Sequence, residues 1–161
     1  MAKIDEIDIQ IANLLVEDGR MSSAEIARRV GGLSERAARY RIERMIREGM
    51  IQVRAVANPR SIGYSTVADV WLQVEAEAVR DVAGSMTEYA CVTYVAYAIG
   101  ETDVSLQVVG RDTAEIYRFV TEVVGRTPGV RKTTTSIVPR VLKDVYQWRF
   151  PDDACVSDSS S

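Results

Sequence analysis

Apolar residues in the first fifty positions recur every three to four residues, which is the spacing of amphipathic helices. The first such stretch ends at a turn around Gly19, and its apolar positions are Ile7, Ile11, Leu14 and Leu15. A second stretch begins at Ser22 and Glu25, which have capping-box spacing, and stops at Gly31 and Gly32. These signals predict two short helices.

A third helix is predicted from Ser34, a favourable N-cap residue, to the glycine at position 49. Its apolar face consists of Ala38, Ile42, Met45 and Ile46. The last two helices are joined by a turn that contains glycine. This arrangement predicts a helix-turn-helix, winged-helix-like domain.

After residue 65 the pattern changes to short strands with alternating apolar positions, separated by two helices. The predicted strands are 66–75, 92–98, 103–109 and 130–142, and the predicted helices are 76–89 and 113–125. The order βαββαβ is the ferredoxin-like plan, so the fold class is α+β. Because the helices cover one face of the sheet and the other carries apolar and aromatic residues, we expect that other face to pack against a second copy.

The chain is 161 residues long, enough for two small domains. We expect four parts: a helix-turn-helix domain (1–56), a linker (57–65), a ferredoxin-like ligand-sensing and oligomerisation domain (66–148) and a polar, disordered tail (149–161).

Charge is distributed unevenly between these parts. The net charge of the whole chain is −3, yet residues 28–60 hold nine arginines and three glutamates, a local charge of +6. A basic segment within a mildly acidic chain indicates that one part binds a polyanion.

The third predicted helix sorts its arginines onto one side. If Ile42 marks the centre of the buried face, the opposite side carries Arg36, Tyr40, Arg44 and Arg47, with Arg39 and Arg41 at its flanks. Such a face suits the major groove, where arginine bonds phosphates or guanine acceptors. A solvated face whose arginines pair with Glu35, Glu43 and Glu48 is the alternative. The position on the second helix of a helix-turn-helix favours DNA binding.

Several classes of function are disfavoured by composition. The sequence has no histidine, and Cys91 and Cys155 lie far apart, so neither a metal site nor a disulfide is expected. Cys91 lies in an apolar stretch, where a buried, unreactive thiol is expected. No apolar run is long enough for a membrane span, and the acidic N-terminus is unlike a signal peptide, so we expect a cytoplasmic protein that binds no membrane.

Four motifs together resemble the leucine-responsive/asparagine regulator (Lrp/AsnC) family. They are "IDEIDIQIANLLVEDGRMSSAEIARRVG", "LSERAARYRIERMIREGMI", "NPRSIGY" and "VRKTTTSIV", and the likeness covers about residues 3–145. The resemblance implies a transcription regulator that binds double-stranded DNA and dimerises through its C-terminal domain, often forming octamers. It also implies an effector, an amino acid or similar small molecule, and neither enzymatic activity nor a cofactor.

The resemblance also implies site residues. The DNA-binding set is Ser34, Glu35, Arg36, Arg39, Tyr40, Arg44 and Arg47, and the effector-binding set is Gly100, Glu101, Thr102, Asp103, Thr133, Thr135 and Ser136. The turn at 100–103 is equally compatible with a purely structural role of Gly100 and Asp103.

Two rival functions stay open. One is an enzyme like the haem-pathway decarboxylases of similar build; those depend on histidine, which this chain lacks. The other is a ligand-binding scaffold that does not bind DNA.

Overall fold

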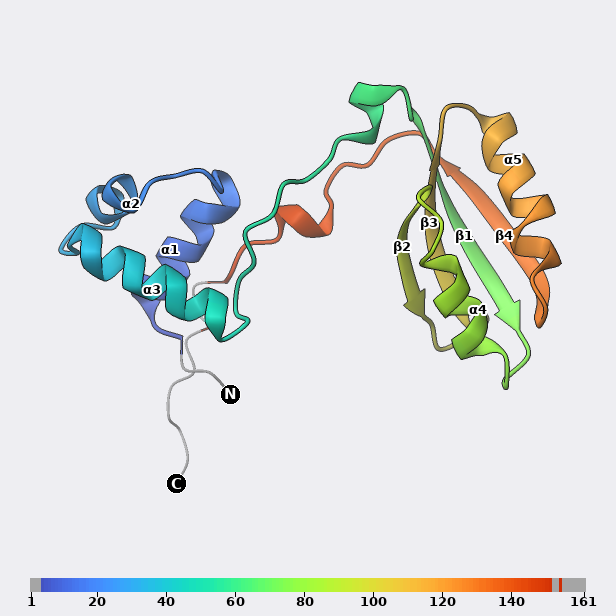
Figure 1. Ribbon diagram of the computed structural model, residues 1–161, viewed down its shortest axis with the longest axis horizontal. Coiled ribbons are helices and arrows are strands. Elements are labelled where there is room, and N and C mark those ends of the chain that lie inside the picture. Colours follow the sequence, from blue (N-terminus) through green and yellow to red (C-terminus); the bar gives the residue numbers. More distant parts are fainter. Residues whose placement is uncertain (1–3, 152–153, 155–161) are drawn as a thin grey trace. The chain divides into compact units, whose positions relative to one another are not determined.

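The computed structural model describes residues 4–151 and residue 154. It divides into two compact units (Figure 1). The helical unit comprises residues up to 56 together with those from 142 onward, and the sheet unit comprises residues 57–141. The chain therefore passes between the units twice.

The helical unit contains the three predicted helices, α1 (Glu6–Glu17), α2 (Ser23–Val30) and α3 (Glu35–Arg47). Each begins at a side chain that accepts a hydrogen bond from the first turn, namely Asp5, Ser22 and Ser34. Their apolar stripes meet in one buried cluster, formed by Ile11, Ala12, Ile26, Ala27, Ala38 and Met45. The helix-turn-helix prediction is confirmed.

The turn between α2 and α3 depends on its two glycines. Gly31 and Gly32 have φ angles of 76° and 64°, a region that residues with a Cβ rarely adopt. Two successive positive φ values redirect the chain in the four residues between α2 and α3. The doubled glycine therefore sets the direction in which α3 leaves the turn.

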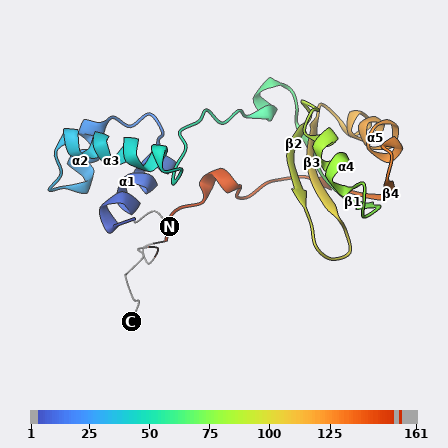
Figure 2. The same ribbon diagram turned by 60° about the horizontal axis from the view of Figure 1, so that its bottom comes forward.

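The sheet unit has the predicted βαββαβ order. Its elements are β1 (Thr66–Val74), α4 (Val79–Met86), β2 (Val92–Tyr97), β3 (Val104–Gly110), α5 (Thr113–Glu122) and β4 (Val130–Val138). The strands are antiparallel in the order β2-β3-β1-β4. Figure 2 shows the turn between β2 and β3 projecting from one end of the sheet. The α+β, ferredoxin-like fold class is confirmed.

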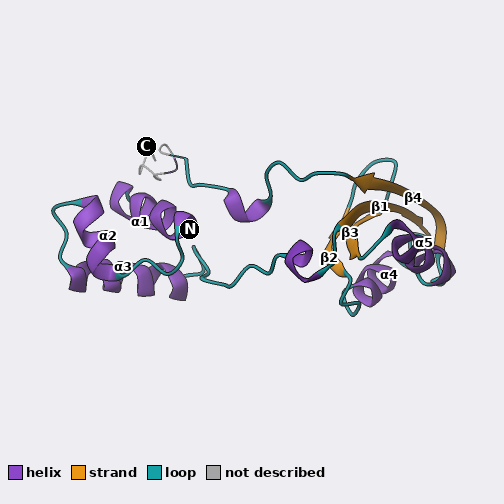
Figure 3. Cartoon of the chain, turned by 90° about the horizontal axis from the view of Figure 1, so that it is seen from above, coloured by secondary structure: helices purple, strands orange, loops and turns teal. Residues whose placement is uncertain are grey.

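Both helices of this unit cover the same face of the sheet (Figure 3). Val70, Leu72 and Leu106 on that face are buried against Met86 of α4 and Ile116 of α5. The opposite face combines exposed Tyr94 and half-buried Trp71 with polar side chains, and Gln107 Nε2 donates to Asp69 Oδ1 at 3.1 Å. This face is more polar than the sequence pattern suggested, and its burial against a second copy stays a prediction.

The last strand ends four residues earlier than predicted. We expected a strand over 130–142, whereas β4 ends at Val138 because Pro139 has no N–H to donate to a ladder. We call residues 142–150, which group with the helical unit, the C-terminal strap. The sequence analysis had assigned residues 142–148 to the sheet domain.

The predicted disordered tail, 149–161, lies mostly outside the described residues. Its first part is described: Phe150 is half-buried and packs against the apolar cluster of the helical unit. In the described part of the chain, no helix is both long enough and apolar enough to cross a membrane.

Candidate DNA-binding surface and effector region

The outer side of α3 exposes three arginines and a tyrosine. Ser34 begins the helix by accepting a hydrogen bond from the Ala37 N–H at 3.2 Å. The exposed side chains that follow are Glu35, Arg36, Arg39, Tyr40, Glu43 and Arg47. Tyr40 is 63% exposed, a large fraction for an aromatic residue.

The arginines of this surface differ in their partners. Arg39 Nη2 lies 2.9 Å from Glu35 Oε1, an exposed pair one turn apart. Arg36 and Arg47 form no ion pair within the described residues. Because exposed pairs are worth little, all three guanidinium groups can be redirected to phosphates or base edges.

Arg44 does not belong to this surface. The sequence analysis placed it on the exposed side, whereas in the structure its side chain is 23% exposed and its Nη2 bonds Asp8 Oδ2 on α1. Arg41 Nη1 bonds Asp8 Oδ1 at 2.8 Å and Asp5 Oδ2 at 2.7 Å. Two of the arginines that we expected at the DNA surface therefore join α3 to α1.

The position of Asp8 explains why the sequence pattern assigned the buried face of α3 incorrectly. The helical wheel was centred on Ile42, but the buried residues are Ala38 and Met45, which lie about 40° and 60° from it toward Arg41. The Asp8 carboxylate is fully buried and attracts both arginines to the α1 side of the helix. A buried ion pair has no apolar signature, so the hydrophobic pattern could not reveal it.

Both arginines of α2 pair with one carboxylate of their own helix. Glu25 accepts hydrogen bonds from Arg28 at 2.6 and 2.9 Å and from Arg29 at 2.9 Å. The hydrogen bonds from Arg28 and then Arg29 lower the pKa of Glu25 to about 2. Burial raises the pKa of Asp5, but hydrogen bonds from Arg41 and the Asp8 N–H outweigh it and hold that pKa below its ordinary value.

These lowered pKa values predict a loss of stability in acid. A carboxyl group whose pKa is lower in the folded state stabilises that state at pH values above its unfolded pKa, which for Glu25 is near 4.5. This stabilisation disappears as the pH falls toward the pKa of the folded state, about 2. We therefore expect the melting temperature of the helical unit, followed by Trp148 fluorescence in a Trp71→Phe background, to fall between pH 5 and pH 2. Glu25→Gln should flatten part of this dependence, and 0.5 M salt should weaken it because Glu25 is exposed. A pH profile identical in Glu25→Gln and wild type would contradict the assignment.

The predicted effector turn is held by the end of β1. The Asp103 N–H donates to Leu72 O at 2.8 Å, and Asp103 Oδ2 accepts from the Val74 N–H at 2.7 Å. Gln73 Nε2 donates to Glu101 O at 3.0 Å. Gly100 has a φ angle of 139°, which favours glycine. One carboxylate oxygen of Asp103 thus has a structural partner, and the turn is rigidly placed.

The predicted hydroxyl groups do not converge on that turn within one chain. Thr133 and Thr135 pair with Leu72 and Val70, so they point to the helix-covered face, whereas Ser136 pairs with Asp69 and points to the other face. Strand β1 lies between β3 and β4, so β4 is two strand spacings, about 10 Å, from the strand that follows the turn.

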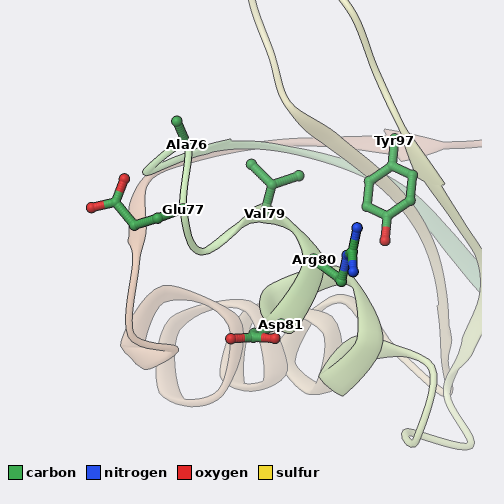
Figure 4. A pocket seen from close by; sticks show the side chains of 6 residues that line it. All are labelled: Ala76, Glu77, Val79, Arg80, Asp81 and Tyr97. Carbon is green, nitrogen blue, oxygen red and sulfur yellow. The ribbon is translucent and has the colours of Figure 1, made fainter.

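A hollow of about 580 Å³ lies between the start of α4 and Tyr97 of β2 (Figure 4). Tyr97, three residues before Gly100, forms one side, and Arg80 of α4 points toward its ring. Glu77 and Asp81 add carboxylates from the segment that begins α4. The sequence analysis missed these residues because their charges are scattered along a helix and show no motif.

Nothing in the described residues forms a nucleophilic or metal centre. Groups of three or more potential metal ligands are absent from the described part of the chain. Cys91 is half-buried, and burial raises the pKa of its thiol, which makes it less nucleophilic.

Family models match both units of the chain. An AsnC-type helix-turn-helix domain matches residues 4–46, and an Lrp/AsnC ligand binding domain matches residues 67–148. An uncharacterised HTH-type transcriptional regulator of Pyrococcus abyssi is 39% identical over 145 residues, covering 89% of this chain and 91% of the relative. The HTH-type transcriptional regulator FL11 of the same organism is 31% identical, covering 89% of this chain and 95% of its own.

Solved structures show the same fold. Escherichia coli AsnC is 21% identical and superposes with a TM-score of 0.81, covering 90% of this chain and 99% of its own. A transcriptional regulator of Neisseria meningitidis, solved as a complex with L-Met, is 27% identical with a TM-score of 0.81 and covers 88% of this chain and 93% of its own.

Proposed function

The chain belongs to the Lrp/AsnC family of DNA-binding transcription regulators, and from this membership we propose which surface binds DNA, which effector it takes and how it assembles. Its relatives are named transcriptional regulators, and it is a regulator with a ligand-binding domain rather than an enzyme.

The DNA contact that we propose is the outer side of α3, entering the major groove from its N-terminal end. The observation that carries this proposal is the exposure of Arg36, Arg39, Tyr40 and Arg47 on one side of the second helix of a helix-turn-helix. Ser34 and Glu35 stand at the end of α3 that would approach the bases. A gel shift at increasing salt separates this proposal from a scaffold that does not bind DNA, because only phosphate contacts produce a steep salt dependence.

The effector that we propose is an amino acid bound at the turn 100–103. The relative from Neisseria meningitidis, solved with L-Met, supports this ligand class. Within one chain β1 separates β4 from the strand that follows the turn, and Ser136 points to the opposite face from Thr133 and Thr135. The site that we propose therefore combines residues of different copies, at a junction between dimers.

Assembly is part of the same proposal. The helix-free face of the sheet, with Trp71 and Tyr94, would be covered in a homodimer, and dimers would associate further, for example into an octamer. A dimer that reads successive major grooves on one side of the duplex needs its two α3 helices about 34–36 Å apart.

The effector proposal predicts a ligand response that depends on charge at Asp103. We expect at least one of the twenty amino acids to raise the melting temperature and change the assembly size of the wild type, because binding at a junction is linked to assembly. Asp103→Asn should lose the response: it keeps an oxygen for the Val74 N–H but has no charge for an ammonium group. Glu122→Gln, which removes a carboxylate charge at an exposed position on α5, is the control. The effector site is elsewhere or absent if no amino acid changes melting, size or DNA affinity.

A further inference from the structure

The end of the C-terminal strap is bonded to α1 by a single side chain. Asn13 Nδ2 donates to Phe150 O at 3.0 Å, and the Phe150 N–H donates to Asn13 Oδ1 at 2.8 Å. A primary amide carries a donor and an acceptor side by side, so it pairs with a peptide group as a neighbouring strand would. Two bonds from one half-buried residue fix the position of the strap on the helix.

Aromatic packing completes this attachment. Phe150 packs against the apolar cluster of the helical unit, which includes Ala38 and Met45 of α3. The rings of Trp148 and Phe150 are 5.1 Å apart and tilted by 55°. The strap therefore contributes to the core on which the recognition helix rests.

The strap is itself ordered. Asp144 Oδ1 accepts from the Tyr146 N–H at 2.9 Å, and the Asp144 N–H donates to Gln147 Oε1 at 3.3 Å, closing a 3-10 turn over Val145–Gln147. Between the strap, α1 and residues 50–56 lies a cleft of about 440 Å³. The strap thus crosses a partly open cleft and is held most firmly at its far end.

Helix α1 connects the strap to the recognition helix. It carries Asn13 on one side and, five residues earlier, Asp8, whose carboxylate bonds Arg41 and Arg44 of α3. A displacement of α1 at Asn13 would therefore be transmitted through these ion pairs to α3. The other end of the strap begins four residues after Val138, the last residue of β4.

We propose that the C-terminal strap is a positioning element for DNA recognition: docked through Asn13 and Phe150, it holds α1, and through α1 it sets the orientation of α3. The proposal rests on α3 being the DNA-binding helix. The strap follows shortly after β4, the last strand of the ligand-binding domain. In this proposal it is nevertheless a structural part of the DNA-binding unit.

The test compares specific with non-specific binding in the full chain. A duplex selected in vitro from random sequences by the wild type serves as the specific site, and the unselected pool serves as the non-specific one. We expect Asn13→Ala to weaken binding to the selected duplex about ten-fold and to leave binding to the pool within about two-fold, because misorientation disturbs base contacts more than phosphate contacts. Alanine favours helix more than asparagine does, so fraying of α1 would not explain the loss.

Two further variants calibrate the result. Asn13→Asp keeps the acceptor for the Phe150 N–H and loses the donor to Phe150 O, so its loss of preference should be intermediate. Gln10→Ala changes an exposed residue one turn earlier on α1 and should behave as the wild type. Hydrogen exchange should be faster at residues 142–150 in both Asn13 variants.

Three outcomes would overturn the proposal. One is fast exchange in the strap of Asn13→Ala with an unchanged preference for the selected duplex. Another is an equal loss of affinity for both kinds of DNA, which would indicate a role in stability alone. If the wild type selects no duplex at all, the assignment of α3 fails and the strap proposal fails with it.

Discussion

Replacing Arg36, Arg39 and Arg47 together by alanine is expected to weaken DNA binding roughly a hundred-fold for each protomer that contacts DNA. These are the arginines on the outer side of α3, and only Arg39 has an ion-pair partner, the exposed Glu35, within the described residues. If each arginine contributes about 1 kcal/mol, the loss of binding free energy is about 3 kcal/mol per protomer, which corresponds to a roughly hundred-fold weaker affinity. The slope of log K against log salt should also flatten by about 0.9 for each phosphate that the variant no longer neutralises.

The matched control removes the same charge from the sheet unit. A variant with Arg118, Arg126 and Arg140 changed to alanine also loses three exposed arginines, so it tests whether net charge alone explains the effect. We expect it to retain most of its affinity and the wild-type salt slope. If both triple variants bind DNA equally well, α3 is not the recognition helix.

Asp8→Ala is expected to destabilise the helical unit by about 3 kcal/mol. It leaves Arg41 and Arg44 without their shared buried carboxylate, and removal of one partner of a buried ion pair costs about 3–5 kcal/mol. Both arginines keep some exposure to water, which places the effect at the lower end. Unfolding in urea, followed by Trp148 fluorescence in the Trp71→Phe background, measures it.

A double substitution distinguishes lost charge balance from lost packing. Asp8→Leu combined with Arg44→Met replaces the pair by apolar side chains, while Arg41 keeps its bond to Asp5. We expect the double variant to be more stable than Asp8→Ala, because apolar replacements avoid leaving an unpaired charge. Equal destabilisation in both variants would mean that the ion pairs do not hold α3 against α1.

Much of the fold could be predicted from the sequence, because the signals involved are local. Helix periodicity, the caps at Ser22 and Ser34 and the alternation in the strands each span fewer than fifteen residues, and all appear in the structure. The turn at 100–103 also lies where Gly100 predicted it. Such features depend on backbone preferences and on the period of burial, which a single segment carries by itself.

The partners of polar side chains were decided only by the tertiary structure. Arg44 was predicted to face solvent, yet Asp8, 36 residues earlier, draws it inward. Asn13 bonds Phe150 across 137 residues, so no local pattern indicates that the strap belongs to the helical unit. Thr135 and Ser136 point to opposite faces as neighbours in any strand do, but only the register of β4 on β1 decides which of them faces the helices. Apolar residues mark a buried face by repetition, whereas a hydrogen bond or ion pair depends on one specific partner that only folding brings into reach.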